Sequence, residues 1–95
     1  MTVLKSAQAG TLESNDIVIT IMPVKVGAGI KIELSSLVLE QYGAQIKDAI
    51  EQTVLAYEVQ DVFIQAVDRG ALDCTIRART IAALSRAGVV IGEGI

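Results

Sequence analysis

Positions 10–22 read GTLESND followed by IVITIM. In the second part every other residue from Ile17 to Ile21 is isoleucine, an alternation that is typical of a strand. A weaker strand candidate, residues 3–11, comes before it. Between the two, Ser14-Asn15-Asp16 contains residue types that tolerate the left-handed backbone of tight turns. The stretch therefore predicts a β-hairpin with the hydroxyl of Ser14 in solvent at its tip, either as a simple turn residue or as a site that another enzyme can reach.

The middle of the chain predicts a third strand and a long helix. Residues 30–35 alternate apolar and polar, so one face of this strand is expected to be buried. The preceding Gly27-Ala28-Gly29 lacks the spacing of a nucleotide-binding loop and is interpreted as a flexible hinge. Over about 37–57, apolar residues recur every three or four positions, from Leu39 and Tyr42 onward, and predict a helix with one apolar stripe. Ser35 and Ser36 are its N-cap candidates.

The last third predicts a strand over 59–67 and a final helix over 71–87. Residues 72–79 also alternate like a strand, and that alternative stays open, but the alanine and arginine content favours helix. Asp73 is four residues before Arg77, the spacing of a helical ion pair. Residues 88–95 contain three glycines and are expected to be a loose tail.

The predicted order is β-β-β-α-β-α, within one domain that spans residues 1–95. So small a sheet cannot have helices on both faces. We therefore expect an α+β fold, with a mainly antiparallel four-stranded sheet and both helices packed on one face.

Composition excludes several classes of protein. The net charge of −3 disfavours nucleic acid as a partner. No apolar run approaches the roughly 18 residues that span a bilayer, and the first ten residues lack the apolar core of a signal peptide. The only cysteine, Cys74, cannot form an internal disulfide, is compatible with the cytoplasm, and is expected to be a small buried apolar residue. The absence of histidine and the single cysteine argue against a metal or catalytic centre.

Two acidic residues flank Ser14, and they could suggest paired carboxylates. On an exposed tip, Glu13 and Asp16 are expected to keep ordinary acidity and to act as solubilising turn residues. Exposed charges steer association with a partner more than they stabilise a complex. Together with Asn15, they are the candidate partner contacts around Ser14.

Two separated motifs give the chain a resemblance to a known family. The first is AGTLESND at positions 9–16, and the second is GALDC at 70–74 followed by RAR at 77–79. In this order and in a chain of this length, they resemble the acyl carrier (gamma) subunit of citrate lyase. The resemblance covers nearly the whole chain. Conventional acyl carrier proteins, by contrast, are helical bundles with Asp-Ser-Leu at a helix start.

The resemblance implies a function and a modified residue. Ser14 matches the serine that carries 2'-(5''-phosphoribosyl)-3'-dephospho-coenzyme A through a phosphodiester, attached by a holo-carrier synthase. The arm's thiol is acetylated, the alpha subunit exchanges acetyl for citryl, and the beta subunit releases oxaloacetate and regenerates the acetyl form. A protein without catalytic equipment and with an exposed serine at a hairpin tip suits this role, because the attached group supplies the reactive atom.

Two alternatives remain from the sequence. The carrier subunit of malonate decarboxylase uses a similar arm on a similar serine, and Leu72-Asp73-Cys74 is the segment that favours citrate lyase. A small ligand-sensing or oligomerisation module with an α+β fold would explain the strands and helices equally well. That module, however, would give no role to the motif at positions 10–16.

Overall fold

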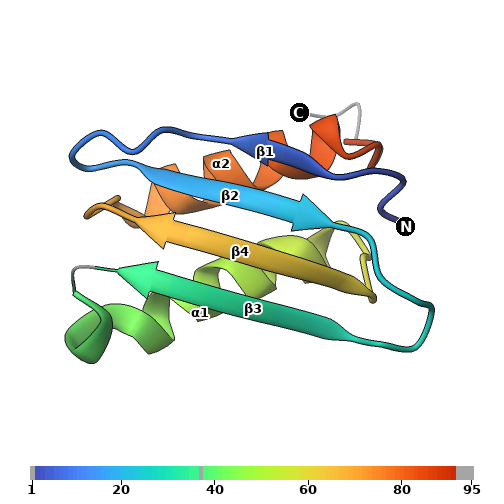
Figure 1. Ribbon diagram of the computed structural model, residues 1–95, viewed down its shortest axis with the longest axis horizontal. Coiled ribbons are helices and arrows are strands. Elements are labelled where there is room, and N and C mark those ends of the chain that lie inside the picture. The colour runs from blue at the N-terminus through green and yellow to red at the C-terminus, as the bar shows by residue number, and fades with distance from the viewer. Residues whose placement is uncertain (1, 37, 92–95) are drawn as a thin grey trace.

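The computed structural model describes residues 2–36 and 38–91. Its elements are strands β1 (Ala7–Ala9), β2 (Ile17–Met22), β3 (Ile30–Ser36) and β4 (Val62–Asp68), and helices α1 (Leu39–Ala56) and α2 (Asp73–Arg86). Figure 1 shows the strands in one sheet with both helices behind the same face. The predicted α+β fold and the order β-β-β-α-β-α are therefore confirmed.

The strands lie in the order β1-β2-β4-β3 across the sheet. β2 is antiparallel to both β1 and β4, whereas β3 runs parallel to β4. Parallel neighbours need a crossover connection, and α1 supplies it between β3 and β4. The sheet is thus mixed but mainly antiparallel, and the last strand in the sequence has an interior position.

The core lies between the sheet and the two helices. β2 forms its centre, since the alternating Ile17, Ile19 and Ile21 that predicted this strand are all 0% exposed. Fully buried side chains from the other main elements meet them: Val62 and Ile64 of β4, Ile50 and Val54 of α1, and Leu84 of α2. Apart from the beginning of α1, the apolar stripes read from the sequence therefore describe the surfaces that the fold removes from water.

The beginning of α1 differs from the prediction. Leu39 and Tyr42 were assigned to the apolar stripe, yet they are 46% and 49% exposed, because the first turns lie at the end of the sheet where less of it faces them (Figure 1). The N-cap assignment of Ser35 or Ser36 is also wrong. Ser36 ends β3, donates from Oγ to Asp68 Oδ2 at 2.8 Å and accepts from the Val38 amide at 3.1 Å.

α2 resolves the conflict between strand and helix periodicity. Its buried residues, which include Ile76 and Thr80, recur at helical spacing, and Arg77 Nε donates to Asp73 Oδ2 at 2.8 Å as the i,i+4 spacing predicts. Cys74 is exposed, so the prediction of a buried cysteine is wrong. It precedes Ile76 by two residues, about 200° around the helix, and so lies on the opposite face.

The two glycine-rich segments are more ordered than predicted. The backbone amides of Gly27 and Gly29 donate to Asp61 Oδ1 at 2.9 and 2.8 Å, which ties the supposed hinge to the start of β4. Val89 is 3% exposed and its amide donates to Leu84 O at 3.0 Å, so this part of the expected tail is packed. Residues 92–95 of that tail lie outside the described residues. Within 2–36 and 38–91, neither helix is long and apolar enough to cross a membrane.

Candidate functional site

Ser14 lies in the turn between β1 and β2, at the end of the sheet where β3 and β4 also terminate (Figure 1). Residues 11–15 are exposed, and Asp16 is the first buried residue after them. The turn closes with the Asp16 amide donating to Glu13 O at 3.2 Å, while Asn15 has a φ of 65°. Asparagine accepts this left-handed conformation more readily than most residues. The predicted turn with Ser14 exposed is confirmed.

Asp16 anchors this turn through four hydrogen bonds. Arg79 on α2 donates two hydrogen bonds to the Asp16 carboxylate, from Nε to Oδ1 at 3.0 Å and from Nη2 to Oδ2 at 2.8 Å. Thr11 Oγ1 donates to Oδ2 at 2.7 Å, and the Ile17 amide donates to Oδ1 at 2.7 Å. Bidentate arginine–carboxylate pairs fix geometry as well as charge. These contacts define the Asp16–Arg79 clamp.

The clamp overturns the expectation that Asp16 is an ordinary exposed carboxylate. Its side chain is only 12% exposed, and hydrogen bonding, first from Arg79 and then from Thr11, holds the pKa of Asp16 well below its usual range. Glu13, in contrast, is exposed as predicted. Sequence reasoning could not pair Asp16 with Arg79, because 63 positions separate them. The RAR motif was visible, but nothing local indicated which arginine turns toward the hairpin.

The other side of the turn rests on the segment that follows β4. The Asn15 amide donates to Arg69 O at 2.7 Å, and the Arg69 amide donates to Asp16 O at 2.8 Å. At the base, Gly10 approaches the backbone so closely that a Cβ there would lie 1.8 Å from Ile17 O. The motif at positions 10–16 therefore has a rigid base made by Gly10, Thr11 and Asp16, and this base presents an exposed tip, Leu12 to Asn15.

Asp16→Asn should lower the urea unfolding midpoint at pH 7, because the neutral amide loses the charge that Arg79 binds. Since the folded pKa of Asp16 lies below its unfolded value of about 3.8, the stabilisation is complete above about pH 5 and is lost as the pH falls below 3.8 toward the folded pKa. The difference in urea unfolding midpoint between the wild type and Asp16→Asn should therefore become smaller as the pH is lowered from 5 to 3. Midpoints measured at these pH values test the expectation.

Glu13→Gln is the matched control for this clamp, because it removes an exposed charge from the same turn and should leave the midpoint at pH 7 nearly unchanged. A gap between wild type and Asp16→Asn that is as wide at pH 3 as at pH 7 would contradict the assignment of the stabilisation to the ionised carboxylate.

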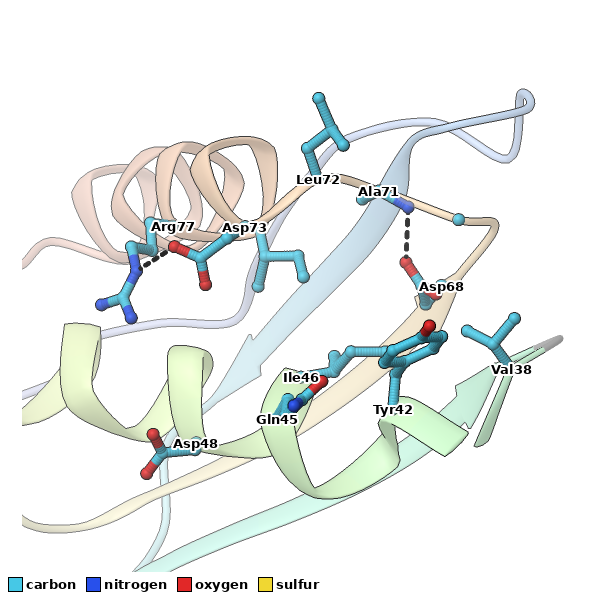
Figure 2. A pocket seen from close by; sticks show the side chains of 12 residues that line it. Val38, Tyr42, Gln45, Ile46, Asp48, Asp68, Ala71, Leu72, Asp73 and Arg77 are labelled. Carbon is cyan, nitrogen blue, oxygen red and sulfur yellow. Dashed lines mark hydrogen bonds and ion pairs between the residues drawn. The ribbon is translucent and has the colours of Figure 1, made fainter. Parts of the chain in front are cut away.

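A groove of about 630 Å³ opens between α1 and α2 at this end of the molecule. Figure 2 shows Tyr42 rising from α1, with Val38 and Ile46 on either side of it, toward the Asp68–Ala71 segment. Polar side chains at the rim include Gln45 and the Asp73–Arg77 ion pair. The volume lies within the range of small-molecule sites. No sequence signal predicted the groove, since its walls come from two distant stretches of the chain, residues 38–48 and 68–77.

Comparison with known proteins identifies close relatives over most of the chain. A citrate lyase acyl carrier protein of Streptococcus uberis is 52% identical over 87 residues, which cover 92% of this chain and 84% of that protein. A citrate lyase acyl carrier protein of Halothermothrix orenii is 51% identical over 87 residues, which cover 92% of this chain and 90% of that protein. A family model described as ACP, malonate decarboxylase delta subunit (MdcD), matches residues 4–87.

Solved structures share the fold at low identity. A chain of a Pseudomonas malonate decarboxylase hetero-tetramer in complex with malonate superposes with a TM-score of 0.75 at 17% identity, covering 93% of this chain and 89% of that one. The RNase P protein of Staphylococcus aureus superposes with a TM-score of 0.51 at 14% identity, covering 86% of this chain and 83% of that one. At these identities the likeness concerns the fold alone.

Proposed function

Because the chain belongs to the acyl carrier protein family that includes the citrate lyase carriers and the malonate decarboxylase delta subunit, we propose that Ser14 is the attachment point of its acyl-carrying arm. The observation that supports this most directly is the exposed Ser14 at the tip of a turn whose base is fixed on two sides. An attachment residue must be reachable by a modifying enzyme and must hold its arm in a defined place. The turn meets both requirements.

The arm that we propose is 2'-(5''-phosphoribosyl)-3'-dephospho-coenzyme A, joined by a phosphodiester. In the loading step the Ser14 oxygen attacks the α-phosphorus of a triphosphate precursor. A P–O bond to Ser14 forms, the bond to the leaving pyrophosphate breaks, and the hydroxyl proton passes to solvent or to a base of the synthase. Once attached, the arm supplies a thiol for thioester chemistry.

The contribution of this chain to the reaction is to hold the arm in a defined position. A tethered acyl group meets successive active sites at a high effective concentration, so the carrier needs a fixed root for its arm and a surface that its partners recognise. We propose that these partners are the synthase and the alpha and beta subunits of citrate lyase, in the bacterial cytoplasm, and that the arm carries acetyl and citryl groups. Glu13 and Asn15, exposed beside Ser14, are the proposed contacts. Asp16 is committed to Arg79 and contributes by shaping the turn.

A second carrier function is supported by one observation, the match to the family model described as the malonate decarboxylase delta subunit. The relatives named as citrate lyase carriers are about 50% identical to this chain, whereas the similar chain from the malonate decarboxylase structure is 17% identical. We therefore favour citrate lyase.

The test of the carrier function is loading by a citrate lyase holo-carrier synthase, followed by intact mass and a thiol assay. Because Cys74 is exposed and would react in the assay, the experiment uses Cys74→Ala, in which any thiol belongs to the arm. We expect one cofactor-sized mass gain and one reactive thiol per chain. Incubation without the synthase is the control. A chain that gains neither mass nor thiol in the presence of an active synthase would contradict the proposal.

A further inference from the structure

The groove between α1 and α2 lies next to the Ser14 turn. The Asn15 amide donates to Arg69 O at 2.7 Å, and the following residue, Gly70, lines the groove. Oδ1 of Asn15 lies 3.5 Å from the place that a Cβ on Gly70 would take. The path from the Ser14 oxygen to Gly70 consists of short backbone steps and the 2.7 Å contact of the Asn15 amide, so the near end of the groove lies within about 10 Å of that oxygen.

The interior of the groove suits a flat, largely apolar group. Tyr42 is 49% exposed although it lies in a concave site, and Val38 and Ile46 form apolar surface on either side of its ring (Figure 2). Exposed aromatic rings in such sites stack against heteroaromatic bases, because both partners present a π-face.

The charges of the lining favour a neutral group over an anion. Asp48, Asp68 and Asp73 line the groove. Asp68 is 1% exposed and accepts hydrogen bonds from Ser36 Oγ and the Ala71 amide. The cation among the lining residues, Arg77, already binds Asp73 at 2.8 Å. This excess of carboxylates repels phosphate and carboxylated acyl groups. The exposed carboxylate of Asp48 is, however, a good acceptor for an exocyclic amino group or a ribose hydroxyl.

We propose that the groove is a docking site on the carrier's own body for the adenosine portion of the arm, with the adenine ring stacked on Tyr42. This inference rests on the proposed function. In an arm attached through its 5''-phosphoribosyl group, the base is about ten bonds from the Ser14 oxygen. At about 1.2 Å per bond it therefore reaches about 12 Å, which is far enough to pass Gly70 and enter the groove. The charged pyrophosphate and the pantetheine with its thiol remain outside, able to enter a partner's active site.

The chain's composition provides a direct test, because Tyr42 and Tyr57 are its only tyrosines and it has no tryptophan. In Tyr57→Phe, tyrosine emission reports Tyr42 alone. Loading of this variant should reduce its emission to about half or less, as expected if the docked state is at least as populated as the free state. Backbone amide shifts of Gln45 and Leu72 in wild type should change on loading as well.

Tyr42→Phe is the matched control. It keeps an aromatic ring in the groove and reports Tyr57, at the far end of α1, whose emission should not change on loading (Figure 1). Intact mass on the same samples separates the two proposals. Full loading with unchanged Tyr42 emission, and with amide shifts confined to the neighbours of Ser14, would overturn the groove proposal and leave the carrier function standing. Failure to load would overturn both.

Discussion

Ser14→Ala should abolish loading, so that intact mass after incubation with the synthase equals that of the unmodified chain. Alanine has no oxygen to form the phosphodiester. Ser14 is exposed, so its replacement should change the free energy of unfolding by no more than about 0.5 kcal/mol. Intact mass measures the first expectation and urea unfolding the second. Together they separate the loss of an attachment atom from the loss of the fold.

Other exposed serines provide the controls for this substitution. Ser6→Ala and Ser85→Ala remove hydroxyls that are also in solvent, and both variants should load as completely as the wild type. Peptide mapping of the loaded wild type should place the added mass on the peptide that contains Ser14. Its discovery on another serine would refute the assignment.

Gly10→Ala should destabilise the protein by about 3 kcal/mol or more and should also slow loading. Its φ of +101° is costly for any residue with a Cβ, by about 1–3 kcal/mol. The added methyl would lie 1.8 Å from Ile17 O, a backbone atom that cannot move without displacing β2. The base of the Ser14 turn would have to open. Urea unfolding and the rate of mass gain are the measurements.

Gly27→Ala isolates the clash from the backbone strain. Gly27 has a φ of +91°, close to that of Gly10, but an added Cβ would meet nothing within 4 Å. In Gly27→Ala, the free energy of unfolding should fall only by the cost of the positive φ, about 1–3 kcal/mol. The variant should load at the wild-type rate. Equal destabilisation by the two alanines would show that the close approach of Gly10 to β2 contributes nothing.

The elements that the sequence predicted correctly are those with a local signal. The isoleucine alternation of β2 and the apolar stripe of α1 are repeated along a single segment, so each can be read without knowing the partner surface. The turn at Ser14 was predictable for the same reason, because Asn15 tolerates a left-handed conformation.

The features that the sequence did not reveal depend on contacts between distant segments. The sequence predicted an unpaired charge at Asp16, but Arg79 on α2 binds it in the structure. Gly27 and Gly29 were predicted to form a hinge, but Asp61 accepts hydrogen bonds from both of their amides. In both cases the deciding partner is set by packing, which the local pattern does not contain. Cys74 is different: it was predicted to be buried from residue type, whereas its local spacing from Ile76 in the predicted helix already directs it outward.

The position of β4 has a consequence for biosynthesis. β4 lies between β2 and β3, so these two earlier strands do not pair with each other, and the four-stranded sheet cannot be completed before β4, Val62–Asp68, has been made. Arg79, which fixes the Ser14 turn, comes later still. A nascent or C-terminally truncated chain therefore has the serine but not the rigid turn that presents it. Modifying enzymes that read the shape of this turn would act only on completed, folded chains.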